Sequence, residues 1–142
     1  MAQTAHSLEE YTGRLWESFP PAAALTGLIS SDRELGFAAL NIALVAFGWW
    51  CLFWPVRRKW LSAPGFVWFW IAIETINGIG HPAWSVAQGG YTPGVATAPI
   101  LLVLALYLAF VLRRTPRWIS RVATAPPASA GERPAEKVRP PA

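Results

Sequence analysis

The sequence has little cysteine and little charge, and both shortages narrow the kinds of protein it can encode. One cysteine, Cys51, among 142 residues excludes an internal disulfide. Charged residues make up 14% of the chain and hydrophobic residues 54%, whereas soluble domains carry about 25% charged residues. A glycine-rich nucleotide loop, a CxxC pair and a nucleophile elbow are also missing from the sequence. The composition that remains favours a membrane protein.

The net charge of +4 does not indicate a nucleic-acid-binding protein. The basic residues gather at the ends of apolar runs, whereas nucleic-acid-binding domains present them together on one soluble face. The first ten residues are polar and include two acids, so they do not resemble a cleavable signal peptide. Nine tryptophans in so short a chain suit a protein whose rings lie at lipid headgroup level.

Three apolar runs organise the chain, and each approaches the ~20 residues with which a helix crosses a membrane. The first extends from about Gly36 to Val56, the second from about Pro64 to His81, and the third from about Gly94 to Leu112. We expect the second helix to end near His81, because Pro82 disfavours helical geometry at the residue before it. The loop would then occupy residues 82–92.

Two other features complete the predicted architecture. Pro99, near the start of the third run, is expected to kink that helix. Before the first run, apolar residues recur at helical spacing, which predicts an amphipathic helix at the interface or packed on the bundle; they are Leu8, Tyr11, Leu15 and Phe19. The Pro- and Ala-rich residues 123–142 predict a disordered tail. We therefore predict an all-α integral membrane bundle of three transmembrane helices over residues 1–122.

The basic residues predict how this bundle is oriented. One cluster lies between the first two runs and another follows the third, whereas the loop between the second and third runs has no Lys or Arg. The clusters are Arg57, Arg58 and Lys59, and Arg113, Arg114, Arg117 and Arg121. Because cytoplasmic loops are enriched in Lys and Arg, both clusters and the tail are expected in the cytoplasm. The N-terminal segment and the loop after the second run are expected outside.

Three polar side chains interrupt the second apolar run. Glu74, Asn77 and His81 are spaced at i, i+3 and i+7, so they lie on one stripe of a helix. A carboxyl group at membrane depth costs ~2.5–3.5 kcal/mol on insertion scales, and such groups usually face a partner or a water-filled cavity. These residues are candidate catalytic residues, with Asn77 orienting a neighbour. A hydrogen bond that only holds helices together is the alternative.

A second polar cluster lies near the N-terminus, where His6 precedes Glu9 by three residues and Glu10 by four. A solvated helix face is the ordinary interpretation of such a run. The predicted topology, however, places it on the same side of the membrane as Glu74 and His81, with Tyr91, Thr92 and Thr97 nearby. Imidazole and carboxylate suit iron, manganese or zinc, and di-iron bundles use such ligands. The candidate metal ligands are His6, Glu9, Glu10, Glu74 and His81.

These motifs together resemble the HXXEE family of small bacterial membrane proteins. The N-terminal motif stands here as His6-Ser7-Leu8-Glu9-Glu10, and the family's second signature as Glu74, Asn77 and His81 followed by Tyr91-Thr92-Pro93-Gly94. The match covers roughly Ala5 to Leu112. The resemblance implies a helical protein of the bacterial plasma membrane with poorly defined biochemistry, and it supplies no substrate. In the family the first motif looks like the end of a transmembrane helix, whereas here five residues precede it.

Three functions remain open from the sequence. The first is a metal-dependent enzyme acting on a lipid or another apolar molecule, with Glu74, Asn77 and His81 in catalysis. The second is a non-catalytic transport, proton-coupling or accessory subunit. Because three helices are few for a transporter, that function needs a homo-oligomer or a membrane partner. The third is a structural protein whose polar stripe holds helices together. Membrane lipid is the expected partner in all three, and nucleic acid in none.

Overall fold

The computed structural model describes residues 2–114, and all the regular structure within that range is helical. The all-α class predicted from the sequence is therefore confirmed, while the predicted tail, residues 123–142, lies outside the described residues. The elements are α1 (Ala2–Thr12), α2 (Leu15–Ser18), α3 (Pro20–Gly27), α4 (Arg33–Cys51), the π-helical turn η1 (Leu52–Val56), α5 (Ala63–Gln88) and α6 (Ala98–Arg114).

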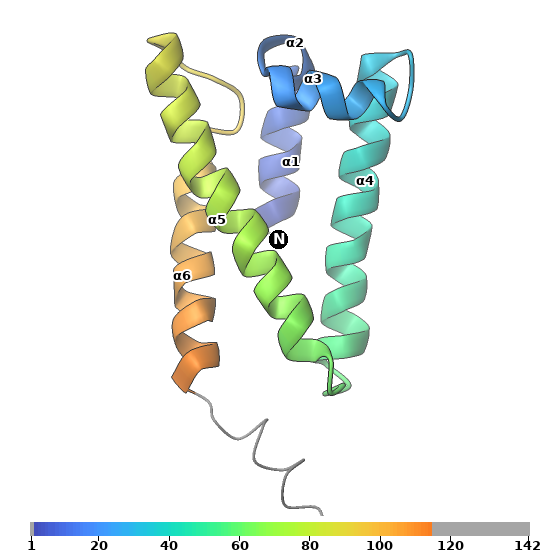
Figure 1. Ribbon diagram of the computed structural model, residues 1–142, viewed down its shortest axis with the longest axis vertical. Helices are drawn as coiled ribbons and strands as arrows, with labels where there is room; N and C mark the ends of the chain where they lie inside the picture. The colour runs from blue at the N-terminus through green and yellow to red at the C-terminus, as the bar shows by residue number, and fades with distance from the viewer. Residues whose placement is uncertain (1, 115–142) are drawn as a thin grey trace, which may run out of the picture.

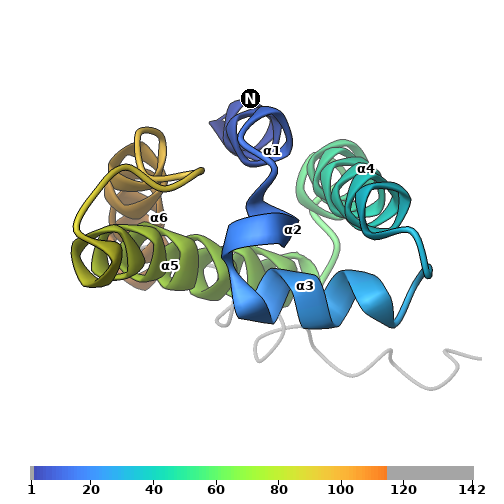
Figure 2. The ribbon, with the colours of Figure 1, turned by 90° about the horizontal axis from the view of Figure 1, so that it is seen from above.

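Three long helices form the frame of the molecule. α4 and α6 run nearly parallel to the long axis, and α5 crosses obliquely between them (Figure 1). α5 and α6 make the most extensive helix–helix contact. Gly78 allows their backbones to approach, because a Cβ atom there would lie 2.5 Å from the Cβ of Leu102. Seen from above, α1 stands between α4 and the α5–α6 pair, with α2 and α3 bridging towards α4 (Figure 2).

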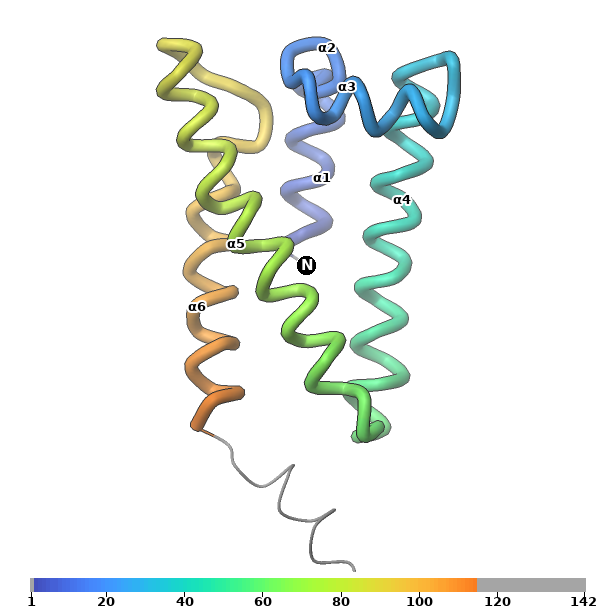
Figure 3. Tube along the Cα trace, in the orientation of Figure 1, coloured from blue at the N-terminus to red at the C-terminus, as the bar shows by residue number. Residues whose placement is uncertain are grey.

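The bundle has two distinct halves along this axis. The upper half holds α1, α2, α3, the start of α4 and the loop between α5 and α6; in the lower half α4 ends, α5 begins and α6 ends (Figure 3). α1 begins level with the middle of α4 and extends only through the upper half (Figure 3). Polar groups introduced by α1 therefore enter one half of the bundle interior and not the other.

The first apolar run forms α4 and η1 as one continuous helical segment. Asp32 caps its start by accepting hydrogen bonds from the backbone N–H groups of Glu34 and Leu35, at 3.0 and 3.1 Å. Pro55 lies in η1, where the wider turn accommodates a residue without an N–H group. The segment from Arg33 to Val56 is long and apolar enough to cross a membrane, and it is the single such helix among the described residues.

The second helix is longer than the sequence predicted. α5 begins at Ala63, close to the expected start, but continues through Pro82 to Gln88, so the prediction that it ends near His81 is wrong. Proline removes one intrahelical hydrogen bond, and contacts on both sides of it outweigh that loss. His81 bonds the following loop, and the Trp84 ring lies 5.3 Å from the Phe19 ring. Gly89, with φ +68°, ends the helix in the left-handed conformation.

The third helix starts later than predicted. α6 begins at Ala98, so residues 94–97 belong to the loop, which runs from 89 to 97 instead of 82 to 92. Pro99 falls in the first turn of α6, where its missing N–H would be unpaired in any case. Its predicted role as a kink in the third helix is therefore wrong. The later start leaves the loop free to fold back over His81.

The predicted amphipathic N-terminal helix is broken into α1, α2 and α3. Arg14 adopts a left-handed conformation with φ 55°, which ends the first helical stretch. Leu8 and Tyr11 are exposed, so they do not form one buried face with Leu15. The buried residues of α1 are instead polar: His6, Ser7 and Glu10. The orientation of α1 is thus opposite to that of an ordinary amphipathic helix, because its polar stripe meets the polar stripe of α5.

Candidate metal centre

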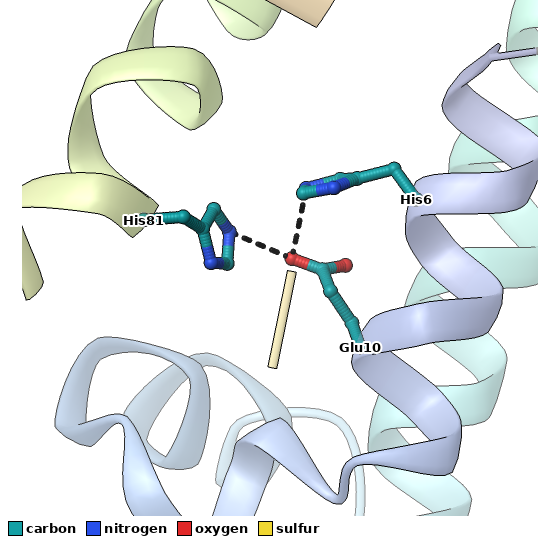
Figure 4. Close-up of side chains that lie close together, drawn as sticks. All are labelled: His6, Glu10 and His81. Atoms are coloured by element: carbon teal, nitrogen blue, oxygen red, sulfur yellow. Dashed lines mark ion pairs between the residues drawn. The ribbon is translucent and has the colours of Figure 1, made fainter. Parts of the chain in front are cut away.

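Three side chains from two helices converge in the interior of the upper half. His6 and Glu10 extend from neighbouring turns of α1, His81 extends from α5, and all three point toward one another (Figure 4). Their candidate ligand atoms lie within 4.8 Å of one another, and the three residues are buried. We call these three residues the His–Glu–His cluster. It brings together groups that are more than seventy positions apart in the sequence, because α1 packs between α4 and α6 and its side chains reach His81 of α5.

One oxygen of Glu10 faces both imidazole rings. Glu10 Oε1 lies 3.3 Å from His6 Nε2 and 3.0 Å from His81 Nε2. The His6 side chain is fully buried, yet its Nε2 makes no hydrogen bond of proper geometry, although its distance from Glu10 is that of an ion pair. Because buried polar atoms are nearly always hydrogen-bonded, this nitrogen is a candidate ligand atom.

The other nitrogen of His6 is held by a threonine and a glutamate. His6 Nδ1 lies 2.7 Å from Thr97 Oγ1, which in turn lies 2.6 Å from Glu9 Oε2. Carboxylate oxygens only accept, so the Thr97 hydroxyl donates to Glu9 and must accept from His6 Nδ1–H. This chain fixes the tautomer: when His6 is neutral, its Nε2 carries a lone pair toward the cluster.

His81 is oriented in the same way by the backbone of the loop. Its Nδ1 lies 2.8 Å from the carbonyl oxygen of Pro93, and because a carbonyl can only accept, Nδ1 carries the proton. Gly94 gives both rings their room: a Cβ atom there would lie 2.5 Å from His81 and 3.1 Å from His6. Its φ of +92° also favours glycine. Both imidazoles therefore present Nε2 to the same space.

Glu9, the neighbour of Glu10, is directed away from the cluster and binds the α5–α6 loop. It accepts hydrogen bonds from the Tyr91 hydroxyl (2.8 Å), the backbone N–H groups of Ala96 (3.0 Å) and Thr97 (2.9 Å), and the Thr97 hydroxyl. Burial raises the pKa of the Glu9 carboxyl, but these donors lower it by more, to about 2. Glu9 is therefore an anion that fastens the loop and, through Thr97, orients His6.

Glu74 and Asn77 lie on α5, on the same stripe as His81 but outside the cluster. The Asn77 side chain interacts with the Glu74 carboxylate. With its amide oriented to satisfy both neighbours, Gln3 donates to Glu74 Oε1 and Oε2 at 2.8 and 3.0 Å and accepts from the Ser7 hydroxyl at 3.2 Å. Glu74 is also close enough to His6 and Glu10 to interact with them electrostatically. A hydrogen-bonded carboxyl group thus stands next to the cluster.

The cluster has the spacing and the charge that a metal ion needs. Ligand atoms about 2.0–2.2 Å from one ion lie about 2.8–3.6 Å apart at octahedral or tetrahedral angles, a range that includes the two distances from Glu10, 3.3 and 3.0 Å. Burial raises the pKa of Glu10, but hydrogen bonds from His6 and His81, and their charge when the rings are protonated, lower it by more, which favours the carboxylate. Each imidazole also donates its remote N–H to an acceptor, as metal-bound histidines do. This group can hold a metal ion.

The sequence analysis named five candidate metal ligands, and the structure brings three of them into the cluster. His6, Glu10 and His81 lie together, whereas Glu9 bonds the loop and Glu74 bonds Gln3. The catalytic roles of Glu74, Asn77 and His81 stay predictions. Sequence reasoning missed Gln3 and gave Thr97 no role. The polar spacing of Gln3, Ser7 and Glu10 along α1 is a signal that could have identified Gln3, whereas Thr97 had none, because its role depends on how the loop folds.

Comparison with known proteins gives one match. The model of the family described as "Protein of unknown function with HXXEE motif" matches residues 1–108, a range that includes both signatures and the whole cluster. No curated protein and no solved structure matches the chain. The match extends over most of the chain and includes the motif His6-Ser7-Leu8-Glu9-Glu10 for which the family is named. The chain therefore belongs to the HXXEE family, whose function is unknown.

Proposed function

We propose that this chain is an integral membrane protein that binds a divalent transition metal in its His–Glu–His cluster and uses it in chemistry on a lipid or another apolar molecule. The observation that carries this proposal is the orientation of the two imidazoles. Both have Nδ1 bonded to an acceptor and both present Nε2 to one oxygen of Glu10. Two histidines and one carboxylate are the ligand set of many non-haem iron and catalytic zinc sites, which keep coordination positions open.

The distribution of apolar side chains supports placement in a membrane. α6 exposes much of its apolar surface, including Ile100, Val103, Leu106 and Phe110, while the most apolar part of the Arg33–Val56 segment is also mostly exposed. The buried polar residues include His6, Glu10 and His81. A chain that exposes apolar side chains and buries charged ones suits a lipid environment. We propose α4 with η1, α5 and α6 as the three membrane-spanning helices.

The charges at the two ends support an orientation. Near the lower end the described residues include five cations and no acid: Arg57, Arg58, Lys59, Arg113 and Arg114. The upper end has two, Arg14 and Arg33, among several acids, and Arg14 is paired with Glu17 at 3.0 Å. By the positive-inside rule the lower end faces the cytoplasm. The cluster would then lie toward the outer leaflet.

The residues around the cluster suit acid–base chemistry beside a metal. A bound ion would supply Lewis acidity, polarising an oxygen of the substrate. Glu74 would exchange a proton with the substrate, Asn77 and Gln3 would hold its carboxyl group in place, and the apolar helices would exclude water. Proton coupling without a metal is the second candidate, because the hydrogen bonds linking Glu74, Gln3 and Ser7 form a continuous polar path in the bundle interior.

Elemental analysis of the full chain, purified in mild detergent without chelators, tests the metal proposal. We expect about one iron, manganese or zinc per chain in the wild type, and a loss of most of it in Glu10→Ala and in His81→Ala. Glu17→Ala is the matched control, because Glu17 lies in the same half and pairs only with an exposed Arg14. A metal-free wild type, or equal metal in all four proteins, would refute the metal site; the metal-free result would favour proton coupling.

A further inference from the structure

Three hollows surround the first turns of α1, and they adjoin one another. The largest, about 560 Å³, lies between α1 and α4, where Ser7 and Ile42 are among its lining residues. A second hollow of about 170 Å³ shares Thr4 and Val45 with the first. A third, about 190 Å³, lies between α1, α5 and α6 and shares two wall residues, Gln3 and Trp70, with the second. Because neighbouring hollows share lining residues, we treat the three together as one bent groove and call it the α1 groove.

The lining of the α1 groove is mostly apolar, with a few polar side chains in each hollow. Aliphatic and aromatic side chains make up most of its wall, among them Val45, Trp70, Leu101 and Leu104. Glu74 lines the third hollow and is the single carboxyl group among all its lining residues. Glu74 also neighbours the His–Glu–His cluster electrostatically. The three hollows therefore extend from the space between α1 and α4 to the carboxyl group that neighbours the proposed metal centre.

We propose that the α1 groove binds one alkyl chain from the bilayer, with a head group that donates a hydrogen bond to Glu74. This inference rests on the proposed function, because it takes the lipid environment from there and supplies the substrate class for the same site. A single-chain amphiphile bound in this way would have its head group beside the cluster, where the chemistry would occur.

The dimensions of the groove favour an alkyl chain over a helix. An α-helix is about 10–12 Å wide with its side chains, whereas neighbouring hollows share only two lining residues with each other. Its two inner hollows are each under 200 Å³. A flexible chain of methylene groups can follow such a bend, and its transfer between lipid and an apolar groove costs little desolvation. A helix of a partner or of a second copy would have to displace α1.

The hydrogen bonds of Glu74 decide what the head group can be. Its carboxylate already accepts from Gln3, and a further ligand group must also donate. A hydroxyl or an ammonium group meets that requirement, whereas a carboxylate has no proton to donate. Both permitted head groups share donor chemistry, and a comparison of probes can distinguish them. The groove should therefore select a long-chain alcohol or amine over the corresponding acid.

Photolabelling of the full chain in lipid nanodiscs tests this inference. The probes are a 16-carbon alcohol, amine and acid, each carrying the same diazirine in the middle of its chain, with labelled peptides identified by mass spectrometry. We expect the alcohol or the amine to label residues of α1 and α4, and the acid to label them about tenfold less. Glu74→Gln should remove this preference, because the glutamine amide can donate a hydrogen bond to the acid.

A matched pair of tryptophan substitutions provides the control. Val45→Trp fills the wall shared by the first two hollows, whereas Val103→Trp adds the same ring to the exposed face of α6. Labelling of α1 and α4 should fall several-fold in Val45→Trp only, with metal content unchanged. Equal labelling in both variants would refute binding in the α1 groove. Equal labelling by acid and alcohol in the wild type would refute it as well. If the wild-type protein contained no metal and was still labelled in the groove, the proposed metal chemistry would be refuted and lipid binding in the groove would be supported.

Discussion

Both halves of the bundle contain packed aromatic rings, and the upper half adds a chain of hydrogen bonds. In the lower half, α4 and α5 meet through aromatic rings: the Phe47 ring lies 5.7 Å from Phe69 and 6.1 Å from Trp70, and Trp50 lies 5.5 Å from Phe66. In the upper half, α1 and the α5–α6 loop meet through a chain of hydrogen bonds that passes from Glu9 through Thr97 to His6.

The two kinds of contact differ in how strictly they fix the positions of side chains. Ring contacts are favourable over a broad range of distances and angles, so small shifts in the lower half cost little. Hydrogen bonds weaken steeply as their angles change, so the upper half specifies one arrangement of its side chains. A site that must place three ligand atoms around one ion needs that second kind of contact. We therefore expect substitutions in the two halves to have different effects on metal binding.

The largest effect is expected from a glycine of the upper half. Gly94→Ala would place a Cβ atom 2.5 Å from the His81 ring in a backbone conformation with φ +92°, so both imidazoles must move. Metal affinity should fall by at least about 100-fold, as measured by competition with a chromophoric chelator.

The matching glycine of the lower half is Gly48, where a Cβ atom would lie 3.0 Å from Trp70 Cζ2. Gly48→Ala should lower thermal stability while leaving metal affinity unchanged. If the two alanine variants lost the same amount of metal affinity, the proposed separation between the halves would fail.

A smaller effect is expected from the hydroxyl that orients His6. Thr97→Val keeps the shape of the side chain but removes the acceptor for His6 Nδ1–H. Metal affinity should fall about 10–100-fold, the usual cost of losing such a partner, and Thr97→Ser should restore it. Thr75→Val is the control, because the Thr75 hydroxyl bonds only Ile71 of its own helix, at 2.7 Å. Unchanged affinity in Thr97→Val would show that His6 needs no such support.

The smallest effect is a pH dependence of the loop contact. The pKa of Glu9 falls from an ordinary 4.5 to about 2 in the folded protein. A carboxyl with a lowered folded-state pKa stabilises the fold above its unfolded pKa, and this contribution is lost as pH falls toward the folded value. Hydrogen-exchange protection at Ala96 and Thr97 should therefore decrease between about pH 4.5 and 2. Glu9→Gln should show no such step; a step of equal size there would assign it to another acid.

Much of the fold could be predicted because apolar runs of membrane length are a strong local signal. The helical class and the start of α5 follow from hydropathy and from the position of Pro64. The end of α5 could not be predicted, because local preference stops a helix before Pro82, whereas the tertiary contacts of His81 and Trp84 continue it. The outward orientation of Leu8 also escaped prediction, since periodicity alone does not say which face of a helix is buried.

The candidate site was predicted in part for the same reason. Helical spacing places His6 beside Glu10, and the predicted topology brings His81 to the same end of the bundle. The separate role of Glu9 was beyond reach, because it depends on backbone N–H groups of a loop whose fold is set by Gly94 and Thr97. Glu9 and Glu10 are equivalent in the sequence motif. They differ in the folded protein because Glu9 bonds the loop and Glu10 faces the two imidazoles.

Glu10 on α1 and His81 on α5 lie far apart in the sequence, and this separation affects the unfolded chain. An ion bound by Glu10 and His81 would act as a removable cross-link that closes a loop of roughly 70 residues, and such a closure lowers the entropy of the denatured chain by an amount that grows only slowly with loop length. Metal and fold would then stabilise each other. A chelator would act on this protein as a reducing agent acts on a disulfide-linked one, releasing α1 from α5 without breaking any covalent bond.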